Sequence, residues 1–275
     1  MPKKTAQPAE YVLEVEDLVV EYGRRRILDG ISMNVRAGEI MVIMGGSGSG
    51  KSTLLRHLLG LEVPAGGTVR MLGRDVSEMT NTEMDDLRQH VGVSFQSGAL
   101  FTSMSVGENV ALPLRERQNL DDNTIRIMTR LKLELVSLAG FENLMPSQLS
   151  GGMIKRAAFA RAIVMDPKLV FFDEPSAGLD PVVSAELDEL IIKLRDALGT
   201  TIIVVTHELE SAFRIADRIT VLDHGRVLVT DTVDAVRNCQ DQRVQDLLNR
   251  TPREMKIDAD DYLRRLTEEE PEYVD

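Results

Sequence analysis

The sequence contains little cysteine and no long apolar run. Its single cysteine, Cys239, cannot form an internal disulfide, which suits a reducing cytosol. The longest apolar stretches, such as residues 169–172 and 202–205, are far shorter than the roughly 20 residues that a membrane-spanning helix needs. Residues 1–11 lack the apolar stretch of a secretory signal peptide. We therefore expect neither an export signal nor a membrane span.

Positive charge is scarce as well. The chain has 32 Lys and Arg residues against 44 Asp and Glu residues, a formal net charge of −12. Proteins that bind the phosphate backbone of nucleic acids usually carry a basic face, so we expect no nucleic-acid partner, although a local basic patch stays open. The hydrophobic fraction of 43% over 275 residues suffices for a packed core in one or two domains.

Residues 45–52 form a glycine-rich segment, G-G-S-G-S-G-K-S, that matches the phosphate-binding pattern G-x-x-x-x-G-K-S. An apolar run at 40–44 precedes it and a leucine-rich stretch at 52–61 follows it, whereas a flexible linker rarely has such flanks. The glycines let successive N–H groups point at phosphate oxygens. We expect Lys51 to reach the β- and γ-phosphates of ATP and Ser52 to bind Mg²⁺. The residues expected to contact the nucleotide here are Gly45, Gly46, Ser47, Gly48, Ser49, Gly50, Lys51, Ser52 and Thr53.

A second phosphate-binding loop, L-S-G-G-M, occupies residues 149–153. Ser150, Gly151 and Gly152 begin a helix, and the N–H groups and positive dipole end of a helix favour a phosphate. A kinase-like phosphoryl transferase needs the first loop without the second, so the pair argues against that class.

Two carboxylates follow a buried strand. Residues 169–172 form a continuous apolar run, as in a parallel strand covered on both faces, and Asp173 and Glu174 come directly after it. The carboxyl ends of such strands form the ligand crevice, so Asp173 can hold Mg²⁺ and Glu174 can polarise the attacking water, unless both are ordinary surface acids. His207 follows another apolar run and is expected at the same edge, near the γ-phosphate.

The pattern along the chain predicts an α/β fold with a mostly parallel sheet. Short β-rich stretches and the first loop occupy the N-terminal part, and a helical pattern runs from about 97 to 165. Strand signals return at 169–173, 201–206, 219–223 and 227–230, with a helix at 182–198 that ends at Gly199. We therefore expect a nucleotide-binding core at 1–96 and 166–240 and a helical subdomain at 97–165. Residues 241–275 form a charged extension in which Tyr262, Leu263 and Leu266 share a possible helical face.

Together these residues resemble the ATPase subunit of an ATP-binding-cassette (ABC) transporter, through about Asn238. The resemblance implies a RecA-like P-loop core, an N-terminal antiparallel β subdomain and an inserted helical subdomain. It implies that Tyr22 stacks on adenine and that Gln96 joins Ser52 and Asp173 at the Mg²⁺ site. It also implies that Asp180 communicates between two sites.

The family resemblance further implies a homodimer that sandwiches two ATP molecules, with the L-S-G-G loop of each chain completing the site of the other. The usual signature has glutamine where this chain has Met153. With Met153 and the segment G-V-S-F-Q-S-G-A-L-F at 92–101, the sequence is similar to the ATPases of the Mla phospholipid-transport systems. That resemblance implies an integral membrane permease, a small STAS-type protein and, indirectly, a periplasmic lipid-binding component. It places the chain peripherally on the cytoplasmic side of the bacterial inner membrane.

The sequence also offers a candidate groove for a permease helix, although core packing is equally open for each of its residues. The groove residues follow Gln96 and are Leu100, Phe101, Met104, Val106 and Leu112. Two other functions stay open. One is the ATPase of a small-solute importer, for example for amino acids. The other is a soluble ABC protein acting on DNA or the ribosome, a class that typically carries long coiled-coil insertions or two cassettes.

Overall fold

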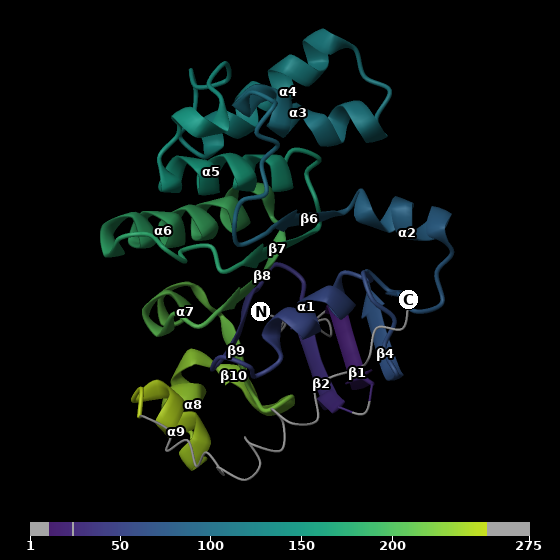
Figure 1. The fold of residues 1–275 in the computed structure, drawn as a ribbon, viewed down its shortest axis with the longest axis vertical. Coiled ribbons are helices and arrows are strands. Elements are labelled where there is room, and N and C mark those ends of the chain that lie inside the picture. Colours follow the sequence, from purple (N-terminus) through teal and green to yellow (C-terminus); the bar gives the residue numbers. More distant parts are fainter. Residues whose placement is uncertain (1–10, 24, 252–275) are drawn as a thin grey trace, which may run out of the picture.

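The computed structural model describes residues 11–23 and 25–251, which form two sheets surrounded by helices (Figure 1). A four-stranded sheet has the order β2-β1-β4-β5, and a six-stranded sheet has the order β10-β9-β3-β8-β7-β6. The first sheet comprises β1 (Tyr11–Tyr22), β2 (Arg25–Arg36), β4 (Gly66–Met71) and β5 (Arg74–Asp75). The second comprises β3 (Ile40–Gly45), β6 (Val91–Ser94), β7 (Leu169–Asp173), β8 (Thr201–Thr206), β9 (Arg218–Asp223) and β10 (Arg226–Thr232).

The six-stranded sheet is parallel except at one edge. Strands β6, β7, β8, β3 and β9 pair in parallel, and β10 is antiparallel to β9. All residues of β3 and β8 are buried, as the apolar runs in the sequence predict for strands covered on both faces. Ile40, Val42 and Met44 pack in one apolar cluster, whereas Met41 and Ile43 pack in the other, because successive side chains of a strand point to opposite faces. The two halves of the core therefore meet at this sheet.

The antiparallel sheet lies beside α1 (Lys51–Leu58), the helix that follows the first phosphate loop (Figure 1). The sequence predicts a helix reaching residue 61, but α1 ends three residues earlier. The chain turns at Gly60, whose φ of 61° lies in the left-handed region that favours glycine. The described chain thus has the α/β architecture with an antiparallel β subdomain that the sequence predicts.

Three helices stand together on the far side of β6 and β7 (Figure 1). They are α3 (Val106–Arg117), α4 (Asp122–Leu135) and α5 (Gly151–Ala162), with the 3₁₀ turn η1 (Pro146–Gln148) before α5. Polar side chains fix where they begin: Ser105 and Glu108 form a capping box on α3, and Asp121 caps α4. All of these helices lie within residues 97–165, where the sequence predicts a helical subdomain.

The remaining helices are α2 (Asn81–Arg88), α6 (Pro181–Leu198), α7 (Leu209–Ile215), α8 (Val233–Arg237) and α9 (Gln242–Leu248). Helix α6 ends at Gly199 with φ 61°, as its sequence predicts. Of the expected C-terminal extension, α9 is described, whereas Tyr262, Leu263 and Leu266 lie outside the described residues. Among residues 11–23 and 25–251, no helix is long and apolar enough to cross a membrane.

Candidate nucleotide-binding site

The first phosphate loop joins β3 to α1 at the carboxyl edge of the six-stranded sheet. The Nζ atom of Lys51, at the first position of α1, donates to the carbonyl oxygens of Gly45 at 2.8 Å and Gly46 at 3.1 Å. Burial lowers the pKa of Lys51, while the negative charges of Glu174 and Asp173 act in the opposite direction. The loop therefore holds a partly buried amine facing two carboxylates.

Two glycines of the loop have no room for a side chain. A Cβ atom on Gly45 would lie 2.3 Å from the carbonyl oxygen of Leu222. Gly50 has a φ of 103°, and a Cβ there would lie 2.6 Å from a methyl group of Leu28. Gly50 also precedes α1 without a side-chain cap, so the first N–H groups of that helix keep their capacity to bind an anion. The backbone thus has uncapped N–H groups at the place where the sequence pattern predicts phosphate binding.

Glu174, which follows the last residue of β7, makes three contacts with residues 205–207. Its Oε1 atom lies 2.8 Å from Nδ1 of His207, and its Oε2 atom accepts a hydrogen bond of 3.1 Å from the hydroxyl of Thr206. Its backbone N–H donates to the carbonyl of Val205 over 2.8 Å. The φ of Glu174 is 45°, a left-handed conformation that is strained for a residue other than glycine. The neighbouring strand end therefore fixes both the backbone and the carboxylate of Glu174.

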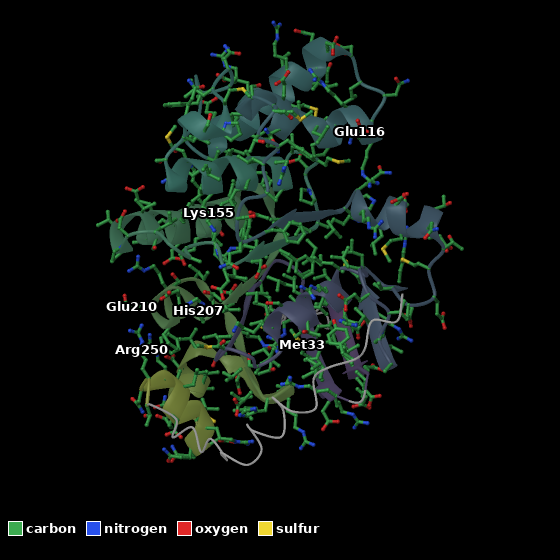
Figure 2. The ribbon with its side chains drawn as sticks, viewed as in Figure 1. Met33, Glu116, Lys155, His207, Glu210 and Arg250 are labelled. Carbon is green, nitrogen blue, oxygen red and sulfur yellow. The ribbon has the colours of Figure 1, made fainter. Side chains whose placement is uncertain are left out.

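These groups line one cavity of about 790 Å³. The expected site residues among its lining are Gly45, Gly46, Ser47, Gly48, Lys51, Ser52, Gln96, Glu174 and His207. The cavity is also lined by Glu208, Leu209 and four residues at the C-terminal end of the described chain, Asp246, Leu247, Arg250 and Thr251. No sequence pattern predicts these residues. Figure 2 labels His207 and Arg250 on the same side of the molecule. The structure thus brings the loop, Gln96, Glu174 and His207 together.

Other expected site residues lie outside this lining. Tyr22 is 46% exposed, and its hydroxyl donates to Glu62, which follows α1. Ser49 belongs to the loop but is buried, and its hydroxyl has no hydrogen-bond partner within the described part of the chain. The backbone carbonyl of Thr53 accepts a 2.9 Å hydrogen bond from Nδ1 of His57, on the second turn of α1. The cavity wall therefore accounts for the phosphate end of the expected site and not for an adenine-binding end.

The residues expected to hold Mg²⁺ offer oxygen ligands of the kind that this ion prefers. Ser52 offers a hydroxyl, Gln96 an amide carbonyl and Asp173 a carboxylate. Burial, and secondly the charge of Glu174, raises the pKa of Asp173, so a bound cation would favour its ionised form. Within the described ranges no group of three or more His, Cys, Asp or Glu side chains could hold a metal ion. This donor set fits Mg²⁺, which usually takes several ligands from phosphates and water.

The second phosphate loop lies against another part of the same chain. Ser150 caps α5, and its hydroxyl accepts a 3.3 Å hydrogen bond from the N–H of Met153. A Cβ atom on Gly152 would lie 2.7 Å from a methyl group of Val183, and one on Gly151 would lie 3.1 Å from a methyl group of Leu179. Asp180 caps α6, which contains Val183. The residues of this loop and Asp180 are thus close to one another and do not line the cavity of the first loop.

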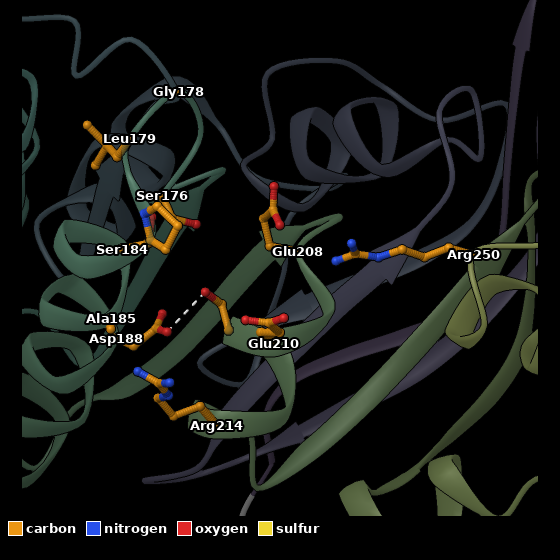
Figure 3. Close-up of a pocket in the computed structure, with 12 residues that line it drawn as sticks. Ser176, Gly178, Leu179, Ser184, Ala185, Asp188, Glu208, Glu210, Arg214 and Arg250 are labelled. Carbon is orange, nitrogen blue, oxygen red and sulfur yellow. Dashed lines mark hydrogen bonds between the residues drawn. The ribbon is translucent and has the colours of Figure 1, made fainter.

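A smaller cavity of about 320 Å³ lies between α6 and α7, beside the segment that contains Ser176 and Gly178 (Figure 3). Asp188 is buried there and accepts a 3.0 Å hydrogen bond from the hydroxyl of Ser211, and burial raises its pKa. Arg250 extends toward Glu208 from the opposite side (Figure 3). The sequence pattern did not indicate this cavity, because its polar residues are spread over three separate segments.

Comparison with known proteins agrees with this arrangement. The family described as "ABC transporter" matches residues 28–177. The chain is 42% identical over 260 residues to the intermembrane phospholipid transport system ATP-binding protein MlaF of Haemophilus influenzae, covering 94% of this chain and 98% of that protein. It is 37% identical over 242 residues to a probable ribonucleotide transport ATP-binding protein, mkl, of Mycobacterium leprae, covering 88% of this chain and 70% of that protein.

Solved structures give the same answer at the level of the fold. The dimeric ATP-binding cassette MJ0796, in a post-hydrolysis state bound to ADP and phosphate, superposes with a TM-score of 0.73 at 30% identity, covering 80% of this chain and 98% of that one. The cassette cbiO1 of Clostridium perfringens, part of an ABC transporter complex, gives 0.78 at 29% identity, covering 93% of this chain and 99% of that one. The chain belongs to the ABC transporter family, as one of its ATPase subunits.

Proposed function

We propose that this chain hydrolyses ATP to power phospholipid transport linked to outer-membrane lipid asymmetry. The observation that carries the proposal is the 42% identity, over nearly the full length of both chains, to a phospholipid transport ATP-binding protein. The cavity supports the ATPase part, because it combines a phosphate loop with a carboxylate held by a histidine.

The first loop and the polar side chains expected beside it have chemical roles in this proposal. The backbone N–H groups of the first loop and the amine of Lys51 bind the β- and γ-phosphates of ATP. Glu174 accepts a proton from the attacking water, and His207 orients the Glu174 carboxylate through the 2.8 Å contact. Mg²⁺, held by Ser52, Gln96 and Asp173, would neutralise charge on the phosphates.

The second loop gives a reason for a homodimer. Ser150, Gly151 and Gly152 begin α5 but do not line the cavity of their own chain, so their anion-binding capacity is available to the ATP of a partner. In the dimer, each ATP contacts the first loop of one chain and the second loop of the other. Tyr22 stacks on adenine, and Asp180, which fixes the start of α6 beside the second loop, links the two sites.

The permease-binding surface lies just after Gln96. Phe101 is 53% exposed, and the segment that presents it is fixed by Asn109, a fully buried side chain. The amide oxygen of Asn109 accepts from the N–H of Phe101 at 2.7 Å, and its amide nitrogen donates to the carbonyls of Phe101, Met104 and Ser105 at 3.0 to 3.1 Å. Leu100, Met104 and Leu112 are partly buried. Val106 is 0% exposed and belongs to the core, so it is not part of this surface.

The full assembly contains the homodimer, an integral membrane permease, a small STAS-type protein and, across the inner membrane, a periplasmic lipid-binding component. The chain lies on the cytoplasmic side of that membrane as a peripheral subunit. Its role is to close and open the dimer as ATP binds and is hydrolysed.

A small-solute importer is the second candidate function. The 37% identity to a probable ribonucleotide transport ATP-binding protein favours it, because the cargo named for that relative is a small solute. The ATPase fold does not select the cargo, so the partner proteins decide between the two functions.

The experiment that tests the proposal is mass spectrometry of the proteins and lipids that copurify with the tagged chain from detergent-solubilised native membranes. A permease, a small STAS-type protein and bound phospholipid are the expected result. A permease of an amino-acid or nucleotide importer would favour the second candidate, and copurification with soluble proteins alone would contradict both.

A further inference from the structure

A buried lysine connects the helix of the second phosphate loop to the catalytic strand. Lys155 is the fifth residue of α5 and is 6% exposed. Its Nζ atom donates to the backbone carbonyl of Gln96 and, over 3.0 Å, to that of Glu174 (Lys155 is labelled in Figure 2). Because a buried ammonium group is costly without acceptors, these two carbonyls fix where the end of the side chain lies.

The two carbonyls occupy equivalent places on neighbouring strands. Ser94 of β6 pairs with Phe172 of β7, and Gln96 and Glu174 each lie two residues beyond that pair. The chain leaves the strand ladder at both positions, so the ladder no longer fixes their spacing. The ammonium group of Lys155 can fix the spacing of the two carbonyls in place of the ladder, because lysine carries three donors and can donate to both. Lys155 therefore ties together the ends of β6 and β7.

A second cation of α5 holds the segment that follows Gln96. The guanidinium of Arg161 donates to the carbonyls of Gly98 at 2.8 Å and Ala99 at 2.7 Å. A Cβ atom on Gly98, whose φ is 76°, would lie 3.0 Å from a methyl group of Ile154 on the same helix. Residues 98–99 are thus packed on α5. Lys155 differs from Arg161 because it also contacts Glu174.

We propose that Lys155 is a positioning residue that transmits the placement of α5 to the backbone of Gln96 and Glu174. The proposal rests on the proposed function, in which the N-terminus of α5 binds the ATP of the partner chain. An ATP bound there fixes α5, and Lys155 then holds Glu174 at the other nucleotide. One side chain thereby links the two ATP sites of the dimer, and hydrolysis at each site depends on occupancy of both.

A purely structural role for Lys155 predicts something different. If its amine only satisfies two buried carbonyls, its loss lowers the melting temperature without changing how the two sites communicate. Another lysine of the helical region provides a matched control. Lys132 of α4 is 7% exposed, and its amine is ion-paired with Asp166 rather than bound to the backbone of Gln96 or Glu174.

The test compares Lys155→Met, Lys155→Arg and Lys132→Met in the full-length chain, by steady-state ATP hydrolysis and by binding of a fluorescent ATP analogue. For Lys155→Met we expect affinity for the analogue within about twofold of wild type, a kcat at least about tenfold lower, and a Hill coefficient that falls to one. Lys155→Arg keeps a cationic donor and should retain most of the kcat and the cooperativity. Lys132→Met should lower the melting temperature while kcat and the Hill coefficient stay unchanged.

Three results would overturn the proposal: an unchanged kcat and Hill coefficient in Lys155→Met, an equal loss in Lys155→Arg, or an equal loss in Lys132→Met. Hydrogen exchange by mass spectrometry tests the same contacts without ATP. Lys155→Met should speed exchange in both segments 97–99 and 174–177, and Lys132→Met in neither. A wild-type chain that hydrolyses no ATP would contradict the proposed function, whereas normal exchange in Lys155→Met would contradict the role of Lys155.

Discussion

The Nδ1 atom of His207 lies 2.8 Å from the Oε1 atom of Glu174, although the two residues are 33 positions apart in the sequence. Glu174 follows β7 and His207 follows β8, and these strands are neighbours in the parallel sheet. The contact therefore depends on strand order. It leaves the Glu174 carboxylate with one oxygen bound to an imidazole and the other to the hydroxyl of Thr206.

Replacing Glu174 by glutamine should slow ATP hydrolysis by roughly 10²-fold or more, the scale typical of losing a general base. The amide has nearly the same shape, so binding of ATP should survive. Single-turnover hydrolysis and titration with a fluorescent ATP analogue measure the two effects separately. Hydrolysis at the wild-type rate would remove Glu174 from the role of base.

Glu174 and His207 should act as a unit. We expect His207→Ala to slow hydrolysis by roughly 10²-fold, and the double variant Glu174→Gln/His207→Ala to be hardly slower than Glu174→Gln alone, because coupled catalytic groups are not additive. The measurement is a double-mutant cycle on kcat. Losses that multiply in the double variant would mean that the two residues contribute independently.

Gly45→Ala should destabilise the chain by about 1–3 kcal/mol, the usual cost of forcing atoms into a packed site. The added Cβ would lie 2.3 Å from the carbonyl oxygen of Leu222 and 2.6 Å from the hydroxyl of Ser49. Gly46→Ala is the matched control, because a Cβ there has no neighbour within 4 Å. Thermal unfolding without nucleotide measures both, and an equal melting temperature for the two variants would contradict the steric argument.

Asp173→Asn should raise the melting temperature of the nucleotide-free chain at neutral pH. Burial and the charge of Glu174 raise the pKa of Asp173 from its ordinary 3.8, so the folded state binds more protons there than the unfolded state. Stability contributed by the protonated carboxyl is therefore lost as the pH rises through the raised pKa. The gain from asparagine should shrink as the pH falls, and melting curves between about pH 5 and pH 8 measure it.

The control for that experiment is Glu116→Gln, which removes one negative charge from an exposed position and should change the melting temperature little. The Asp173→Asn variant should also lose Mg²⁺-dependent ATP hydrolysis. If Asp173→Asn melts at a lower temperature than wild type at neutral pH, the prediction is contradicted, because the surroundings then stabilise the charge of Asp173.

Phe101→Asp should abolish copurification with the permease while leaving ATP binding intact. Phe101 is exposed, and the segment around it is held by Asn109 through backbone atoms, so the substitution changes the surface and not the fold. Tyr11→Asp adds the same charge at an exposed aromatic residue of β1, away from this segment. Unchanged recovery of the permease with Phe101→Asp would contradict the proposed surface.

The sequence predicted those features that depend on local pattern. The apolar runs placed β7 and β8 correctly, and the glycine spacing located the first loop together with its flanking strand and helix. Contacts between distant segments were not accessible in this way. The hydrogen bonds from Lys155 span 59 and 19 positions and depend on how α5 packs on the sheet. Val106 carries the same apolar signal whether it is exposed or buried, and only packing identified it as core.

The four hydrogen bonds of Asn109 have a consequence for how this ATPase can diverge. They reach only main-chain atoms of Phe101, Met104 and Ser105, so the path of that segment does not depend on which side chains it carries. A lineage can therefore exchange the exposed residues of the segment while the backbone keeps its course. The choice of partner can therefore change independently of the fold. The buried amide of Asn109 preserves the backbone path of the segment, and substitutions at its exposed side chains can suit it to a new membrane subunit.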